Sequence, residues 1–118
     1  DIEWWLSMSP NEFEEEIAEY YRLQGADAEK TSSSRDGGFD VKVTKDNTTF
    51  LVECKRWKRG SKVSRPDLQK LLGAVVERRA DYGVFVTTSD FTNDAKEYSK
   101  KVKIELINGE RLTSGHQN

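Results

Sequence analysis

The sequence has 118 residues and a net charge of −2, which suits one compact domain with a single core and gives no overall attraction to an anionic partner. Hydrophobic residues make up 35% and charged residues 34% of this globular composition, and no apolar run is long enough to span a membrane or resembles a signal peptide. The single cysteine, Cys54, excludes an internal disulfide and a cysteine zinc cluster, so the reducing cytoplasm is the simplest location.

The first predicted element is a helix. The Ser-Pro-Asn-Glu pattern at 9–12 is typical of a helix start, with serine as the N-cap and proline at the first helical position. Apolar residues then recur at helical spacing until Gly25, which predicts a helix over about 10–24. Residues 1–8 form an apolar segment that we expect to pack on this domain or on a domain upstream, because the chain does not begin with methionine and looks like part of a longer polypeptide.

A short strand is expected near Ala28–Thr31, followed by two strands in which polar and apolar residues alternate. Asp46 and Asn47, between these two strands, tolerate positive φ and predict a two-residue turn. Such a turn fixes the cross-strand register and buries one apolar face. The expected apolar pairs are Phe39 with Cys54, Val41 with Val52, and Val43 with Phe50.

The same register places Asp40 opposite Glu53, with Lys55 two residues further along the same face. Two adjacent carboxylates repel each other unless a cation lies between them. Oxygen ligands with a neighbouring backbone carbonyl suit Mg²⁺, and an amine beside them can orient a water molecule or help to deprotonate it. Taken singly, Glu53 and Lys55 would form an ordinary surface ion pair and Asp40 would be solvated. Their position on one face favours a metal-dependent hydrolytic site.

The residues around these three have simpler interpretations. Gly37 and Gly38 permit the close approach of another backbone, either that of a DNA strand or that of an ordinary turn. Cys54 lies between Glu53 and Lys55 but points to the core face. Its side chain is therefore interpreted as a small buried hydrophobe and not as a nucleophile.

The remaining elements complete a mixed sheet covered by helices, which is an α/β (α+β) fold. They are expected in this order: a helix capped by Ser64 and running to about Ala80, a strand over 84–86, a helix that starts at Ser89 or Thr92, a strand over 104–107, and a disordered or truncated tail after Leu112.

Charge is segregated along the chain. Residues 1–29 hold nine acidic residues and one basic residue, whereas residues 54–66 hold six basic residues and no acidic one. A segregated basic patch can bind phosphates even in a slightly acidic protein, although solvated loops have the same composition.

Two stretches, 36–40 (DGGFD) and 53–58 (ECKRWK), resemble the PD-(D/E)xK nuclease superfamily and, more narrowly, the Mrr-type restriction endonuclease catalytic domain. The likeness starts at 9–14 (SPNEFE) and ends near 104–109, so it covers almost the whole chain. It implies a restriction-endonuclease-like core, α-β-β-β-α-β, with helices flanking a central mixed sheet. The implied catalytic domain spans 9–112, between an N-terminal segment 1–8 and a tail 113–118.

The resemblance also implies an activity and a set of site residues. The activity is metal-dependent DNA cleavage with Mg²⁺, for which Mn²⁺ can substitute. Asp40 and Glu53 match the metal-binding acids, Lys55 matches the catalytic lysine, and the Cys54 carbonyl is the neighbouring main-chain ligand. Glu14 matches an acid of the first helix that often completes the metal site, directly or through water. Many Mrr-type relatives have glutamine where Glu53 stands.

The basic segment after Lys55 leads away from this site, where the phosphates next to the scissile bond would lie. Trp57 could contact sugar or base, or could simply cover the hairpin, and Gln69 could reach DNA or face solvent. The residues expected to contact DNA are Arg35, Arg56, Trp57, Lys58, Arg59, Lys62, Arg65 and Gln69.

The family analogy suggests a restriction enzyme that acts on foreign or modified DNA in a prokaryotic cytoplasm, with recognition by an upstream domain. Three alternatives remain: a Holliday-junction-resolving or DNA-repair nuclease on the same core, a DNA-binding module that has lost cleavage, and a purely structural domain. The intact set of Asp40, Glu53 and Lys55 argues against the second, and the third would bind neither metal nor DNA. Cutting both strands would require two sites and hence a homodimer, but no surface in the sequence identifies its interface.

Overall fold

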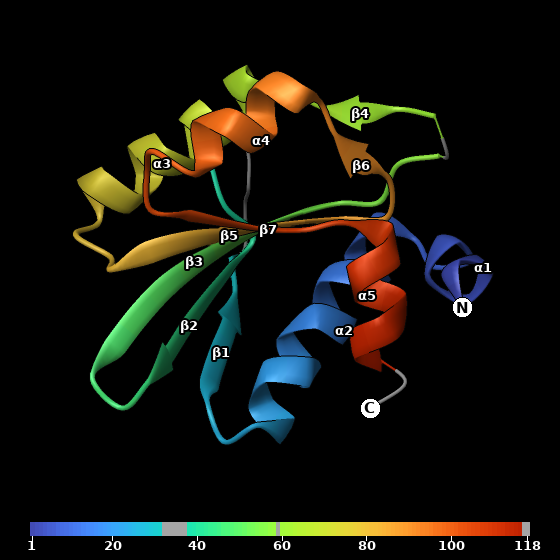
Figure 1. Ribbon diagram of the computed structural model, residues 1–118. Coiled ribbons are helices and arrows are strands. Elements are labelled where there is room, and N and C mark those ends of the chain that lie inside the picture. Colours follow the sequence, from blue (N-terminus) through green and yellow to red (C-terminus); the bar gives the residue numbers. More distant parts are fainter. Residues whose placement is uncertain (32–37, 59, 117–118) are drawn as a thin grey trace.

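The computed structural model describes residues 1–31, 38–58 and 60–116, which form an α/β structure (Figure 1). The helices are α1 (Ile2–Leu6), α2 (Pro10–Leu23), α3 (Arg65–Glu77), α4 (Asn93–Ser99) and α5 (Gly109–His116). The strands are β1 (Asp27–Lys30), β2 (Val41–Lys45), β3 (Thr48–Lys55), β4 (Lys62–Val63), β5 (Tyr82–Thr87), β6 (Asp90–Phe91) and β7 (Ile104–Ile107).

The main sheet has five strands in the order β1-β2-β3-β5-β7. The first three strands are antiparallel, whereas β3, β5 and β7 are parallel, with α3 as the crossover between β3 and β5. A parallel pair of short strands, β4 and β6, lies outside this sheet and was not predicted. The predicted mixed sheet flanked by helices is confirmed.

Each face of the sheet carries its own hydrophobic core. Figure 1 shows α3 and α4 over one face, and α2 with α5 over the other. The apolar side of α2, with Phe13 and Ile17, packs on Val41, Val52 and their neighbours. The apolar side of α3, with Leu68 and Leu71, packs on the opposite face. No helix among the described residues is long and apolar enough to cross a membrane.

The turn of the β2–β3 hairpin has the predicted geometry. Asp46 and Asn47 have φ values of 52° and 66°, the left-handed conformation that a two-residue hairpin turn requires. The register that follows pairs Val41 with Val52 and Val43 with Phe50, as predicted. This part of the sheet was predictable because the turn residues and the alternation of apolar residues demand the same register.

The predicted pairing of Phe39 with Cys54 is wrong. The β2–β3 ladder ends at Val41 and Val52, and the N–H of Asp40 donates to the Val52 carbonyl at 2.7 Å, one residue out of register. The side chain of Phe39 therefore lies in the core beneath α3, and the guanidinium carbon of Arg78 is 5.1 Å from the centre of its ring. The shift has two causes: Gly38 turns the backbone with φ 73°, and the Asp40 carboxylate replaces a main-chain partner of Cys54.

Gly38 cannot be replaced without strain. Its φ of 73° disfavours any residue with a Cβ, and a Cβ there would lie 3.0 Å from the carbonyl oxygen of Lys70 in α3. We expect Gly38→Ala to lower the free energy of unfolding by about 2–3 kcal/mol in urea titrations. Gly25→Ala is the matched control, since Gly25 has φ 92° and open space around its Cβ position. Its cost should be about 1 kcal/mol, and equal losses in the two variants would contradict the role of the contact with α3.

The helices differ from the predictions mainly at their ends. The capping box of α2 is present, with Ser9 Oγ accepting from Glu12 N at 3.1 Å and Glu12 Oε1 accepting from Ser9 N at 2.8 Å. The α3 helix ends at Glu77, before the predicted Ala80, because Arg79 adopts a φ of 56°.

Near the C-terminus, one alternative is decided and one prediction is wrong. Thr92 caps α4, whereas Ser89 precedes β6. The predicted disordered tail after Leu112 is instead helical as far as His116. This helix, α5, covers the sheet on the α2 side and anchors Leu112 in the core. Its stability comes from that tertiary contact, which a short and mostly polar segment does not reveal in sequence.

Candidate active site

Asp40 is a buried carboxylate held at the start of β2. It is 4% exposed, and its Oδ2 accepts a hydrogen bond of 2.8 Å from the backbone N–H of Cys54 in β3. Its own carbonyl accepts from the N–H of Thr31 at 2.9 Å. The side chain is therefore tied to β3 and the main chain to residues on both sides, which fixes the direction of the carboxylate.

Glu53 and Lys55 project from β3 beside Asp40. Lys55 Nζ lies 3.3 Å from Glu53 Oε2, and the side chains are 36% and 14% exposed respectively. The other carboxylate oxygen of Glu53, Oε1, is buried and has no hydrogen-bond partner among the residues that the structure describes. Burial and the neighbouring Asp40 carboxylate raise the pKa of Glu53 to about 8, against the opposing effect of Lys55. The structure thus brings these three residues together, but the predicted pairing of Asp40 directly opposite Glu53 is wrong, because Asp40 is one residue out of that register.

The arrangement fits a hard divalent cation. A buried carboxylate oxygen without a partner, next to a second carboxylate, is relieved by a positive charge placed between them. Because the N–H of Cys54 points to Asp40, its carbonyl points to the same side of β3. Among the described residues, no group of three or more histidine, cysteine, aspartate or glutamate side chains gathers as a metal cluster. Mg²⁺ usually keeps several water ligands and binds substrate phosphates, so it does not need a closed set of protein ligands.

Glu14 belongs to the surroundings of the same site. It lies on α2, and its pKa is raised, first by burial and then by the Asp40 carboxylate, while Lys30 and Lys55 lower it. The carboxyl therefore lies within electrostatic range of Asp40 and Lys55. This position agrees with a role at the edge of the site, and a direct bond to a metal stays a prediction.

The thiol of Cys54 takes no part in this arrangement. Its side chain is buried in the core on the α2 side, and burial raises the pKa of the thiol. A protonated, enclosed thiol is a poor nucleophile. Only the main chain of Cys54 is placed to contribute.

The raised pKa of Glu53 predicts how stability depends on pH. A carboxyl whose folded pKa lies near 8, against an ordinary value of 4.5, stabilises the fold while it is protonated, and this contribution is lost as pH rises from about 4.5 to about 8. In metal-free buffer, Glu53→Gln should therefore be more stable than wild type at pH 8.5, on the order of 1–3 kcal/mol, and similar to it at pH 4.5. Urea unfolding with a chelator at both pH values measures this difference. A constant difference between the two proteins would contradict it.

The basic residues after Lys55 divide into two groups. Lys58 and Lys62 are exposed, as is Gln69 on α3. Arg65 is engaged in contacts within the protein. Its guanidinium donates to both carboxylate oxygens of Asp94 at 2.8 and 3.0 Å and lies over the ring of Tyr98. The DNA contact expected of Arg65 stays a prediction that this pairing does not favour.

Arg56 and Trp57 are partly buried. Arg56 Nη1 donates to the Leu6 carbonyl at the end of α1 at 3.4 Å, and its buried Nε has no hydrogen-bond partner within 1–31, 38–58 and 60–116. Trp57 packs against the core cluster beneath α3, which also contains Leu51 of β3. Arg35, Gly37 and Arg59 lie outside the described residues.

Sequence reasoning assigned no role to two buried residues near the site, Thr87 and Thr88 at the end of β5. The signal that could have found them is the sequence Thr-Thr-Ser directly after a buried apolar strand, where polar side chains need partners.

Comparison with known proteins decides the family. The Mrr_cat family model, described as a restriction endonuclease, matches residues 5–114. The chain belongs to this family. Within the Mrr-type family, it is 34% identical over 116 residues to the type IV methyl-directed restriction enzyme EcoKMrr of Escherichia coli, covering 91% of the chain and 38% of that enzyme.

Solved structures of restriction endonucleases share the fold of this Mrr-type domain. The MspJI restriction endonuclease, in complex with a 27-mer oligonucleotide, has a TM-score of 0.58 and 27% identity over 81% of the chain and 24% of MspJI. The DNA modification-dependent restriction endonuclease AspBHI has a TM-score of 0.64 and 17% identity over 94% of the chain and 33% of AspBHI. The chain thus spans less than half the length of each of these three relatives.

Proposed function

We propose that this Mrr-type domain is a metal-dependent DNA endonuclease, the cleavage part of a restriction enzyme that acts on foreign or modified DNA. The observation that carries the proposal is the juxtaposition of Asp40, Glu53 and Lys55, with a buried glutamate oxygen that has no hydrogen-bond partner in the described part of the chain. The names of the relatives support the substrate, since EcoKMrr is methyl-directed and AspBHI depends on DNA modification.

The proposed cofactor is Mg²⁺, with Mn²⁺ as a substitute, held by Asp40, Glu53 and the Cys54 carbonyl, with Glu14 at the edge of the site. When bound, such an ion polarises the scissile phosphate and lowers the pKa of water. Lys55 directs its amine toward the carboxylate pair, where it orients the attacking water and offsets negative charge that develops on the phosphate. The hydrogen bond from the Cys54 N–H fixes the direction of the Asp40 carboxylate, and we propose that this direction suits binding of the ion.

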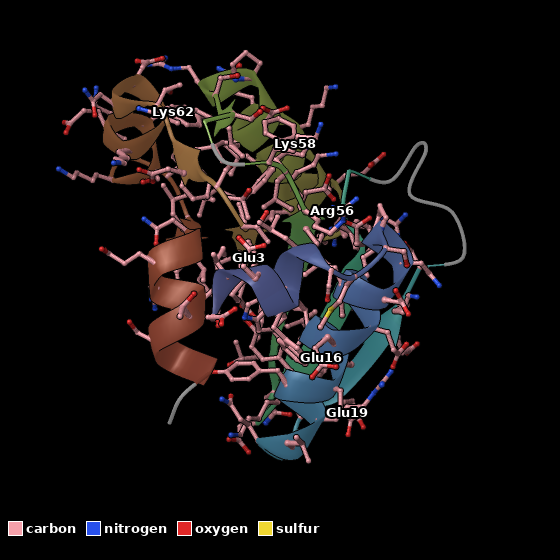
Figure 2. All side chains as sticks on the ribbon, turned by 90° about the vertical axis from the view of Figure 1, so that its right-hand side faces the viewer. Glu3, Glu16, Glu19, Arg56, Lys58 and Lys62 are labelled. Carbon is pink, nitrogen blue, oxygen red and sulfur yellow. The ribbon has the colours of Figure 1, made fainter. Side chains whose placement is uncertain are left out.

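Two lysines in the segment that follows Lys55, Lys58 and Lys62, are exposed. Figure 2 shows Arg56, Lys58 and Lys62 in one part of the surface and Glu16 and Glu19 in another, on α2. The basic residues after Lys55 and the acidic residues of α2 therefore lie on different parts of this face, with Glu3 of α1 drawn between them (Figure 2). Lys58 and Lys62 are proposed to contact phosphates, which would make binding weaken as salt concentration rises.

Incubation with supercoiled plasmid and Mg²⁺ or Mn²⁺ tests the proposal. We expect nicked or linear products that require the metal. A folded protein that binds DNA but does not cut it, alone or with the rest of its polypeptide, would support the non-cleaving binding module instead. Preference for four-way junctions over linear duplexes would support a junction-resolving nuclease, and methylated against unmethylated plasmid tests the dependence on modification.

Because this chain spans only part of its relatives, selection of the target is proposed to reside in a separate DNA-recognition domain upstream. Two copies of the domain would be needed to cut both strands, so a homodimer on DNA is the proposed assembly. Analytical ultracentrifugation with and without duplex DNA measures whether the protein is a monomer or a dimer.

A further inference from the structure

Two threonines are buried at the end of β5, next to the proposed catalytic strand. Thr87 is 0% exposed and Thr88 is 4% exposed. With Asp40, they are the buried polar or charged residues among those that the structure describes. Buried hydroxyls cost free energy unless they have hydrogen-bond partners, so their partners indicate what they do.

Both hydroxyls donate to backbone carbonyls in the segment 55–57, at the end of β3. Thr87 Oγ1 lies 2.8 Å from the Lys55 carbonyl oxygen, and Thr88 Oγ1 lies 2.6 Å from that of Trp57. The backbone N–H of Thr88 also donates to the Lys55 carbonyl, at 3.2 Å. These bonds hold the main chain at the point where β3 ends and the basic segment begins.

The threonines are themselves fixed from the opposite side. The N–H of Ser89 donates to Thr87 Oγ1 at 3.2 Å, and the N–H of Gly109, at the start of α5, donates to the Ser89 carbonyl at 2.9 Å. Gly109 packs so closely that a Cβ there would overlap the Thr88 carbonyl oxygen. The turn after β5 is therefore wedged between α5 and the end of β3.

We propose that Thr87 and Thr88 are positioning residues for DNA cleavage, which hold the Lys55–Trp57 backbone so that the Lys55 amine stays beside Glu53. This inference rests on the proposed nuclease function. Neither threonine is expected to touch the substrate or a metal. The Lys55 side chain starts from the backbone that the threonines hold, so a change in the direction of its Cα–Cβ bond moves the region that the amine occupies. Misplacement of a reacting group by about 1 Å can cost about 100-fold in rate.

Valine variants test the proposal because they remove the hydroxyl and keep the shape of the side chain. Thr87→Val and Thr88→Val should each lower the single-turnover cleavage rate, at saturating DNA and Mg²⁺, by about 10–100-fold. The Kd for DNA, measured without metal, should stay within about twofold, because the exposed lysines are untouched. The pH profile of the rate should shift, since the amine and the carboxylate pair no longer keep their distance.

Serine variants and a remote control separate positioning from loss of stability. Thr87→Ser and Thr88→Ser keep the hydroxyl and should recover most of the rate. Ser99→Ala removes a hydroxyl-to-carbonyl hydrogen bond of 2.8 Å in α4, and should cost some stability without changing the rate. All rates are measured below the thermal midpoint of each protein, and if one valine variant does not fold, the other decides.

Folded valine variants with the wild-type rate and pH profile would overturn the inference. It would equally be overturned if the serine variants were as slow as the valine variants. Wild-type protein that cuts no plasmid in any metal would overturn the nuclease function itself, and this result appears before any variant is compared. Failure of the inference and failure of the function are therefore distinguishable.

Discussion

Lys55→Ala is expected to lower the rate of plasmid cleavage by about 10²–10⁴-fold while the chain stays folded. The reason is the position of the amine, 3.3 Å from Glu53 Oε2 and beside the site proposed for the phosphate. Its contribution to folding is small, because the side chain is 36% exposed and an ion pair at that exposure adds little. The rate at saturating DNA should fall. The affinity for DNA should change by no more than the removal of one positively charged side chain explains.

A second lysine variant makes this result specific. Lys101→Ala removes the same charge from an exposed position in the turn after α4 and should leave the rate unchanged. Circular dichroism and the thermal midpoint establish that both variants are folded. If Lys55→Ala cuts DNA at the wild-type rate, the lysine has no part in the chemistry, and the site would need another group to orient the water.

The central hairpin could be predicted from the sequence because several local signals agree. Asp46 and Asn47 fix the turn, and the alternation from Val41 to Cys54 fixes which side chains face the core. Glu53 and Lys55 then share the opposite face without further assumptions. Sequence patterns are strong where turn chemistry and burial impose the same register.

The start of β2 could not be predicted in the same way. Asp40 bonds through its side chain to the backbone of Cys54, and this bond competes with the regular ladder. Phe39 consequently moves to the other face of the sheet, although the alternation of apolar residues places it with Val41. A side-chain-to-backbone bond across strands leaves no periodic signal, so the departure from register is visible only in three dimensions.

The basic segment shows a similar limit. Its composition predicts a positively charged surface, but the composition does not show which basic side chains pair with acidic residues elsewhere in the fold. Arg65 is neutralised by Asp94, a residue 29 positions away, whereas Lys58 and Lys62 are exposed. The hydroxyl bonds of Thr87 and Thr88 likewise join strands separated by α3. Long-range pairings of this kind depend on the complete fold.

Asp40→Asn and Asp40→Ala should both lower the cleavage rate by about 10³-fold or more. The two variants should differ in stability. Either change removes one of the two adjacent carboxylates that are proposed to hold the metal. Asparagine keeps a side-chain oxygen that can accept the hydrogen bond from Cys54 N–H, and it removes a negative charge that raises the pKa of Glu53. In metal-free buffer, Asp40→Asn should therefore be as stable as wild type or more stable.

Alanine instead leaves the buried N–H of Cys54 without its partner, so Asp40→Ala should lose about 1–3 kcal/mol in urea unfolding. Titration with Mg²⁺ completes the comparison: the metal should raise the thermal midpoint of wild type and of neither variant. If Asp40→Asn is still stabilised by Mg²⁺ to the wild-type extent, Asp40 is not a ligand, and its burial serves only to hold β2 against β3. If Mg²⁺ no longer raises the thermal midpoint while Asp40→Asn remains fully folded, metal binding explains why a buried carboxylate stands at position 40.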